Sequence, residues 1–169
     1  RDVLGCAQTG TGKTCAFAAP ILQQLSGRKA QGRPIRALIL TPTRELALQI
    51  QDEIRQLCAF LAGDPGGLPL RRPAHRPADQ PAEKAPPDRG GHPRPAHGHM
   101  KRRTIRLHKV ETVVLDEADR MLDMGFIKDV TRILKQIPHR RNLGMFSATI
   151  SREVMDISWV YQRDPVRLV

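Results

Sequence analysis

The chain has 169 residues, with 28 Lys and Arg against 17 Asp and Glu and a formal net charge of +11. Its length suits one domain, and a hydrophobic fraction of 40% is enough for a single packed core. A transmembrane helix is excluded, because no run approaches about 20 apolar residues. The basic excess indicates a polyanionic partner, nucleic acid before membrane, since no amphipathic basic helix with aromatic anchors is present.

The first part of the chain alternates strand and helix patterns. Residues 3–7 form a short apolar strand candidate, followed by a Gly-rich turn and a helix candidate over 13–25. Residues 36–41 have the composition of a buried strand. Residues 43–61 carry apolar side chains at helical spacing, at Leu46, Ile50, Ile54 and Leu57.

The middle of the chain has a different composition. Residues 62–99 hold nine of the 14 prolines and six of the 13 glycines, and contain no Ile, Val, Phe, Met, Trp or Tyr. Such a sequence builds neither a strand nor a packed helix, so as written it is a disordered or aberrant segment. Strand candidates follow at 110–115 and 142–147, with a helix candidate at 127–137. The alternation predicts an α/β fold with a parallel sheet flanked by helices.

The ends and the cysteines bear on the origin of the chain. No signal peptide is visible and the first residue is Arg1, so we expect a fragment. Cys6, Cys15 and Cys58 are odd in number and scattered, which favours buried thiols of a reducing compartment over a disulfide framework. We therefore expect a cytoplasmic protein with no membrane partner.

The strongest motif lies between the first strand and helix candidates. It consists of Ala7, Gln8, Thr9, Gly10, Thr11, Gly12, Lys13 and Thr14. This is a phosphate-binding loop with Ala in place of its first Gly. Glycines let the backbone N–H groups face phosphate oxygens, and the helix N-terminus adds its positive dipole end. We expect Lys13 to reach the β- and γ-phosphates and the Thr14 hydroxyl to ligate Mg²⁺; the alternative is an ordinary Gly-rich turn.

Four residues follow the strand candidate at 110–115: Asp116, Glu117, Ala118 and Asp119. They stand at the carboxyl end of that strand, where ligand sites of α/β proteins gather. Asp116 is expected to hold Mg²⁺ opposite Thr14, directly or through water. Glu117 is expected to orient or deprotonate the attacking water. The alternative is a solvated helix start with acids in its first turn.

Further motifs carry a family resemblance. Residues 42–47 (P-T-R-E-L-A), 120–126 (R-M-L-D-M-G-F) and 147–149 (S-A-T) complete an ordered set with the two motifs above. Together they resemble the motifs of a DEAD-box RNA helicase, over residues 1–61 and 100–169. The resemblance implies an incomplete RecA-like P-loop NTPase domain, the first domain of an enzyme that couples ATP hydrolysis to RNA unwinding. Its cofactors would be ATP and Mg²⁺.

The resemblance also implies roles for single residues. Lys13, Asp116 and Glu117 would be catalytic. Pro42, Thr43 and Arg44 would lie at the RNA face, where phosphate contacts give affinity without sequence preference. Ser147, Ala148, Thr149 and Asp119 would link the nucleotide site to the RNA site. From the residues alone, 42–47 also reads as a helix start with Thr43 as N-cap, and both interpretations are compatible.

The sequence departs from the family in three respects. The chain lacks the upstream glutamine motif that recognises adenine, and it lacks the second RecA-like domain with its arginine finger. The double-glycine and T-P-G-R motifs expected within 62–99 are also missing. Without the second domain, we expect weak nucleotide binding, very slow turnover and no unwinding by the fragment.

Two alternative functions remain open on the sequence. One is a different P-loop NTPase, such as a DNA translocase. The other is a non-catalytic RNA-binding module. Glu117 of residues 116–119, here named the acidic tetrad, argues against it.

The missing motifs suggest a change of reading frame. Codons for residues 91–96 (G-H-P-R-P-A), read one base later, permit A-T-P-G-R, and those for 70–73 permit Y-G-G. We hypothesise two compensating frame changes, near residues 58–65 and 99–100. The rival interpretation is a genuine proline-rich insert acting as a linker or partner-binding segment. A metal site at His75, His92, His97 and His99 is a weaker alternative, because the segment offers no scaffold and no Cys neighbours.

Resequencing the DNA that encodes residues 55–105 tests the frame hypothesis. We expect one base gained or lost near each end of the segment. We also expect the polypeptide as written to be marginally stable, because apolar strand-like pieces are replaced by coil. An unchanged frame on both DNA strands would leave the insert as the explanation.

Overall fold

Five strands form one parallel sheet: β1 (Val3–Cys6), β2 (Ala37–Leu40), β3 (Thr112–Asp116), β4 (Asn142–Ser147) and β5 (Val166–Leu168). The computed structural model describes residues 1–8, 10–26, 34–61 and 107–168. The strand order is β2-β3-β4-β1-β5, and every neighbouring pair is parallel. The carboxyl ends of all five strands therefore lie at one edge of the sheet.

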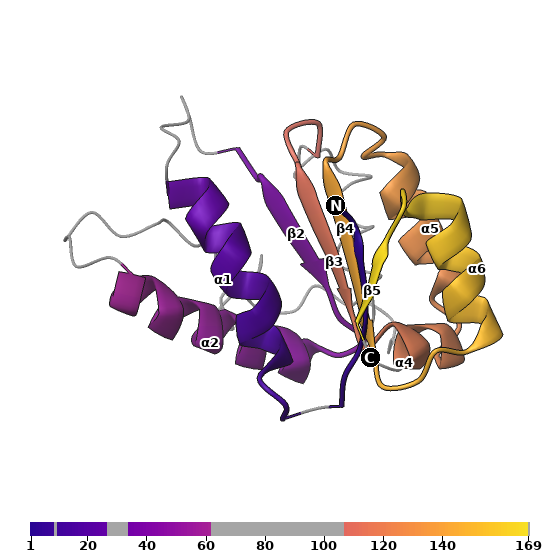
Figure 1. Cartoon of the computed structure of the whole chain (residues 1–169), viewed down its shortest axis with the longest axis horizontal. Helices are drawn as coiled ribbons and strands as arrows, with labels where there is room; N and C mark the ends of the chain where they lie inside the picture. The colour runs from indigo at the N-terminus through magenta and orange to yellow at the C-terminus, as the bar shows by residue number, and fades with distance from the viewer. Residues whose placement is uncertain (9, 27–33, 62–106, 169) are drawn as a thin grey trace, which may run out of the picture.

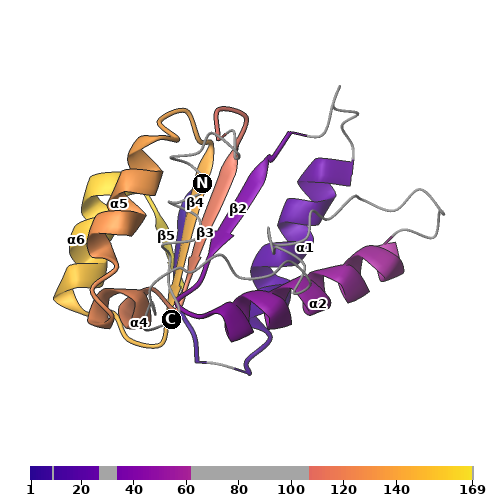
Figure 2. The same cartoon turned by 180° about the vertical axis from the view of Figure 1, so that it is seen from behind.

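Helices cover both faces of this sheet (Figure 1). One face carries α1 (Lys13–Ser26) and α2 (Arg44–Leu61), and the other carries α4 (Ala118–Asp123), α5 (Ile127–Lys135) and α6 (Arg152–Tyr161). The view from behind shows the same separation (Figure 2). Among the residues described, no helix combines the length and hydropathy that a membrane span requires.

The central strands bury both of their faces, as strands of parallel sheets do. In β3, Val113 and Leu115 belong to the hydrophobic cluster beneath α4, α5 and α6, whereas Val114 belongs to the cluster beneath α1 and α2. All three are at most 2% exposed. This two-sided burial explains why β3 reads as a continuous apolar run in the sequence.

Phe146 of β4 depends on glycines in its own strand and in β1. A β-carbon at Gly5 would lie 2.8 Å from Cδ1 of the Phe146 ring, and one at Gly144 would lie 3.1 Å from Cε2. The ring also packs against Phe17 of α1, with centroids 5.3 Å apart. The two glycines thus leave the space that the aromatic ring fills beneath α1.

Buried polar side chains fasten the opposite, amino-terminal edge of the sheet. Asp2 accepts a hydrogen bond from the backbone N–H of Leu143 at 2.7 Å. Gln162 donates to the carbonyl oxygens of Val3 and Leu143, at 2.8 and 2.9 Å, and accepts from the Ser158 hydroxyl. Because these bonds bridge β1, β4 and the end of α6, they align the two strands that carry site residues at their other ends.

The sequence predicted most of these elements. The expected strands at 3–7, 36–41, 110–115 and 142–147 are confirmed as β1 to β4, and the three expected helices as α1, α2 and α5. It missed α6 and β5, and it offered α4 only as the alternative interpretation of residues 116–119 as a helix start. A signal for α6 was present, because Ser151 caps it by accepting from Val154 N–H, and Ile157 and Tyr161 follow at helical spacing. No such signal exists for β5, which has three exposed residues.

Residues 62–99 lie outside the described part of the chain. The expectation that strand-like pieces are replaced by coil concerns these residues; in the described sheet, β2 pairs directly with β3, from Ala37–Thr112 to Leu40–Leu115. The long segment between these strands in the sequence does not separate them in the sheet.

Gly5→Ala tests the packing of Phe146. We expect the added methyl group to lower the free energy of unfolding by about 1–3 kcal/mol, because the ring has to move. Chemical denaturation followed by circular dichroism measures the loss. In the double variant Gly5→Ala/Phe146→Leu the clash is absent, so its loss should be smaller than the sum of the two single losses; additive losses would contradict this explanation.

Candidate nucleotide and catalytic site

The motif residues meet at the carboxyl edge of the sheet. The loop of residues 7–14 follows β1, residues 41–43 follow β2, Asp116 ends β3 and Ser147 ends β4. In the strand order, β4 lies between β3 and β1. The acidic tetrad and the glycine-rich loop are therefore held on either side of the end of β4.

The glycine-rich loop has the backbone of a phosphate cradle. Gly10 and Gly12 have φ values of +81° and +80°, a region that side chains rarely adopt, and a β-carbon at either position would meet nothing within 4 Å. The Thr11 hydroxyl closes the turn by donating to the carbonyl of Gln8 at 2.8 Å. Glycine is needed here for its conformation, and the open space suits an approaching anion. Thr9 lies outside the described residues.

Lys13 forms a buried ion pair with Asp116. The distance from Nζ to Oδ1 is 2.8 Å, and the two side chains are 7% and 4% exposed. The same carboxylate oxygen accepts from the backbone N–H of Glu117 at 3.0 Å. Lys13, which is expected to bind phosphates, and Asp116, which is expected to hold the metal, thus neutralise each other. Each would have to release the other before it could hold its expected ligand.

Glu117 occupies an unusual backbone position. Its φ of 53° and ψ of 52° place it in the left-handed region as the N-cap of α4, with no capping bond from its side chain. The carboxylate instead accepts from Nη1 of Arg120 at 3.3 Å, and its side chain is 9% exposed. A strained, buried acid of this kind persists only where its surroundings determine it, which is typical of functional sites.

The end of β4 joins the loop to the acidic tetrad. The carbonyl of Ser147 accepts from Ala7 N–H at 2.9 Å, and its hydroxyl accepts from Asp119 N–H at 3.0 Å. Asp119 Oδ2 in turn accepts from the backbone N–H and the hydroxyl of Thr149, at 2.9 and 2.8 Å. A further contact, which the sequence did not predict, joins the Cys6 thiol to the carbonyl of Ala148 at 3.4 Å.

These contacts alter the acidity of Asp119. Burial acts to raise the pKa of its carboxyl, but hydrogen bonds from Thr149 and Arg120, with a contribution from Ser147, outweigh burial and lower the pKa below its ordinary value. Asp119 is therefore held as a carboxylate that fixes the turn at 147–149 against α4.

The residues expected at the RNA face begin α2. Pro42 is fully buried, whereas Arg44 is exposed. The Thr43 hydroxyl accepts from Leu46 N–H at 3.3 Å, so the predicted N-cap is confirmed. Arg44 is thus presented to solvent at the same sheet edge as the loop.

The donor set fits Mg²⁺ bound together with a nucleotide. The half-buried Thr14 directly follows Lys13, and Asp116 provides a carboxylate; hydroxyl and carboxylate oxygens are ligands that Mg²⁺ prefers. Within the described ranges, no group of three or more His, Cys, Asp or Glu could hold a metal by itself. Thr14 and Asp116 would therefore share the ion with phosphate oxygens and water.

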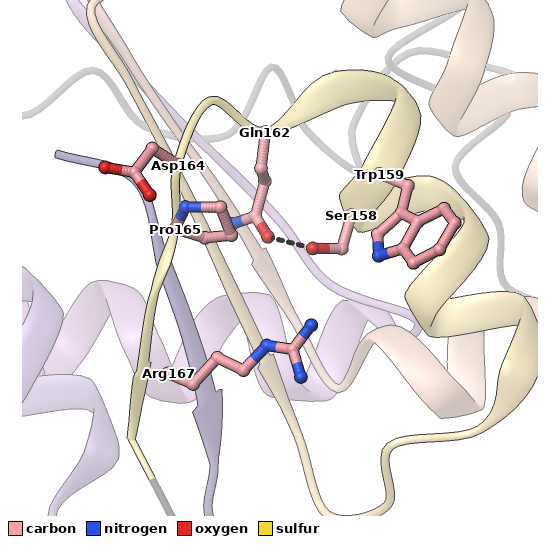
Figure 3. Close-up of a pocket in the computed structure, with 6 residues that line it drawn as sticks. All are labelled: Ser158, Trp159, Gln162, Asp164, Pro165 and Arg167. Atoms are coloured by element: carbon pink, nitrogen blue, oxygen red, sulfur yellow. Dashed lines mark hydrogen bonds between the residues drawn. The ribbon is translucent and has the colours of Figure 1, made fainter.

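A separate pocket lies between the end of α6 and β5 (Figure 3). Residues at the end of α6 and the start of β5 line it: Ser158, Trp159, Gln162, Asp164, Pro165 and Arg167. Gln162 bonds to Val3 at the start of β1, whereas the glycine-rich loop follows the end of that strand. This pocket is remote from the motif residues and takes no part in the candidate site.

The fold and the order of its motifs define the class of the protein, an α/β domain with a phosphate-binding loop after β1 and an acidic tetrad after β3. The sequence model of the DEAD/DEAH box helicase family matches residues 1–157. The chain therefore belongs to this family.

Named relatives agree with this assignment. The chain is 38% identical over 169 residues to the ATP-dependent RNA helicase CshA of Limosilactobacillus reuteri, covering 98% of this chain and 32% of that protein. It is 39% identical over 165 residues to the ATP-dependent RNA helicase DeaD of Buchnera aphidicola, covering 98% of this chain and 27% of that protein. The chain thus spans about a third or less of the length of these two relatives.

Solved structures share the fold. A DEAD box protein from Methanococcus jannaschii superimposes with a TM-score of 0.74 at 33% identity, covering 99% of this chain and 44% of that chain. The yeast DEAD-box splicing factor Prp28 gives a TM-score of 0.77 at 29% identity, covering 99% and 41%. The expected RecA-like α/β fold is confirmed.

Variants of the Lys13–Asp116 pair test its place in the apo domain. We expect Lys13→Met to lower the free energy of unfolding by about 3–5 kcal/mol, because it leaves a buried carboxylate unpaired. The double variant Lys13→Met/Asp116→Asn removes both charges and should recover most of that loss. Denaturant unfolding of the nucleotide-free chain measures both. A double variant no more stable than Lys13→Met would show that the charges are not paired in solution.

Proposed function

We propose that the chain is the ATP- and RNA-binding first domain of a helicase in which ATP hydrolysis drives the separation of RNA duplexes. The observation that carries the proposal is the buried contact of Lys13 with Asp116 beside an open glycine-rich loop. A P-loop NTPase requires this cation and this acid at one nucleotide. The printed names of the relatives, ATP-dependent RNA helicases, support the same activity.

In this function the chain's own residues bind and orient the reactants. The loop amides and Lys13 hold the phosphates, and Lys13 exchanges the Asp116 carboxylate for phosphate oxygens. Thr14 and Asp116 would hold Mg²⁺, which would supply charge neutralisation at the phosphates. Glu117 orients the attacking water toward the terminal phosphate.

RNA binding engages the neighbouring end of β2. Thr43 and Arg44 contact the phosphates of a single strand or a short duplex, and these contacts position the RNA without reading its sequence. The turn of Ser147, Ala148 and Thr149 touches Cys6, Ala7 and Asp119, and we assign to it the link between the nucleotide site and the RNA site.

The chain alone supplies part of the catalytic machinery. Stabilisation of the charge that develops during phosphoryl transfer requires a further cation, which we assign to a second RecA-like domain. The relatives are about three times as long, which leaves room for it. The 169 residues by themselves should bind ATP weakly, hydrolyse it very slowly and unwind nothing. Of the three thiols expected to be buried, only Cys58 is buried, whereas Cys6 is partly exposed and Cys15 is exposed; all three are free, which fits a cytoplasmic location.

Thr14→Val tests the metal and nucleotide assignment. Removing the hydroxyl should weaken binding of a fluorescent ATP analogue about tenfold in Mg²⁺ and little in EDTA, because only the metal-dependent part is lost. Fluorescence titration measures both affinities. The matched control is Thr131→Val on α5, whose hydroxyl donates to its own helix at the carbonyl of Lys128. Equal losses of affinity in Mg²⁺ and in EDTA would contradict the assignment of Thr14 as a metal ligand.

Arg44→Gln tests the RNA face. We expect weaker binding of a labelled single-stranded RNA and a fall of about one in the slope of log affinity against log salt, as for one lost phosphate contact. Arg55→Gln is the control, since Arg55 is a second exposed arginine of α2 and pairs with Asp52. If both variants lose the same affinity, net charge rather than a defined contact holds the RNA.

A further inference from the structure

Arg120 covers the acid to which we assign the attacking water. Its Nη1 lies 3.3 Å from Oε2 of Glu117, and the two side chains are 57% and 9% exposed. The guanidinium therefore stands on the solvent side of a buried carboxylate. The sequence placed Arg120 within a family motif but gave it no role.

No backbone group at the start of α4 holds the Glu117 side chain. It makes no capping bond, although it occupies the N-cap of α4. Its backbone is held by two bonds, from its N–H to Asp116 Oδ1 and from Met121 N–H to its carbonyl. With the backbone held in the left-handed region, the hydrogen bond from Arg120 adds to burial in restricting the carboxylate.

Arg120 is itself tied to the turn at the end of β4. Its backbone N–H donates to Oδ1 of Asp119 at 2.9 Å. The other oxygen of Asp119 accepts both bonds from Thr149. One continuous series of contacts thus runs from Thr149 through Asp119 and Arg120 to Glu117.

We propose that Arg120 is a positioning residue, whose guanidinium holds the Glu117 carboxylate in place and whose own position is set by the Asp119–Thr149 contact. This inference rests on the proposed function, in which Glu117 orients the attacking water. The phosphate loop lies between β1 and α1, and Lys13 begins α1, so neither takes part in the contact of Arg120 with Glu117.

Three variants separate charge, geometry and general stability. Arg120→Met keeps much of the apolar stem and removes the charge, and Arg120→Lys keeps the charge. Arg55→Met is the matched control, because Arg55 also donates from Nη1 to an acid three residues away, at 3.0 Å, on the exposed face of α2.

The first measurement uses the nucleotide-free chain. The unfolding midpoints of Glu117→Gln, Arg120→Met and the double variant form a cycle that isolates the pair. We expect the double variant to be shifted by clearly less than the sum of the single shifts, since each single change already removes the contact. Additive shifts would show that the two side chains do not interact in solution, and would overturn the proposal.

The second measurement separates positioning from structure. With protein in excess over labelled ATP, Arg120→Met should lower the hydrolysis rate constant about tenfold and leave the affinity for the fluorescent ATP analogue within about twofold. Arg120→Lys should recover most of the rate, and Arg55→Met should match the parent. A rate equal to the parent in Arg120→Met, or a parallel loss of rate and affinity, would contradict a positioning role.

Thr149→Val tests the rest of the series. Combined with Arg120→Met, it should lower the hydrolysis rate constant by less than the product of the two single effects, because both changes release the Glu117 carboxylate.

Failure of the proposed function gives a different result, since the parent chain would then not bind the fluorescent ATP analogue at all. A parent chain that binds but releases no measurable phosphate leaves the nucleotide-free cycle to decide.

Discussion

The buried ion pair of Lys13 and Asp116 is the interaction around which the site is organised. It joins the first residue of α1 to the last residue of β3. The strand that leads into α1 is β1, and β4 separates it from β3 in the sheet. Its two charges are nearly excluded from solvent, so each is costly without the other. The free domain therefore keeps the pair closed, and a phosphate and a metal ion are ligands able to replace both partners at once.

The end of β4 gives this pair its context. Ser147 is fully buried and contacts both the loop after β1, through its carbonyl, and α4, through its hydroxyl. The turn that follows adds the bonds between Asp119 and Thr149. Because β4 lies between β1 and β3, this turn contacts the glycine-rich loop and the acidic tetrad together.

The candidate site is built on strands from both sides of residues 62–99 in the sequence, β1 and β2 before them and β3 and β4 after them. β2 pairs directly with β3, and the residues between them in the sequence do not enter that pairing. The motif residues after β1, β3 and β4 stand in the interior of the strand order, whereas Thr43 and Arg44 follow the edge strand β2.

The sequence by itself determined the family motifs and most of the elements. Three features are local patterns in the sequence: the glycine-rich loop, the acidic tetrad and the apolar runs of β1 to β4. Local patterns can be recognised before the fold is known. The strand order, the closed Lys13–Asp116 pair, the need for Gly5 beneath Phe146 and the contact of Arg120 with Glu117 were decided only by the tertiary structure. Each depends on residues that are brought together by packing or by a left-handed backbone, and no spacing in the sequence records either.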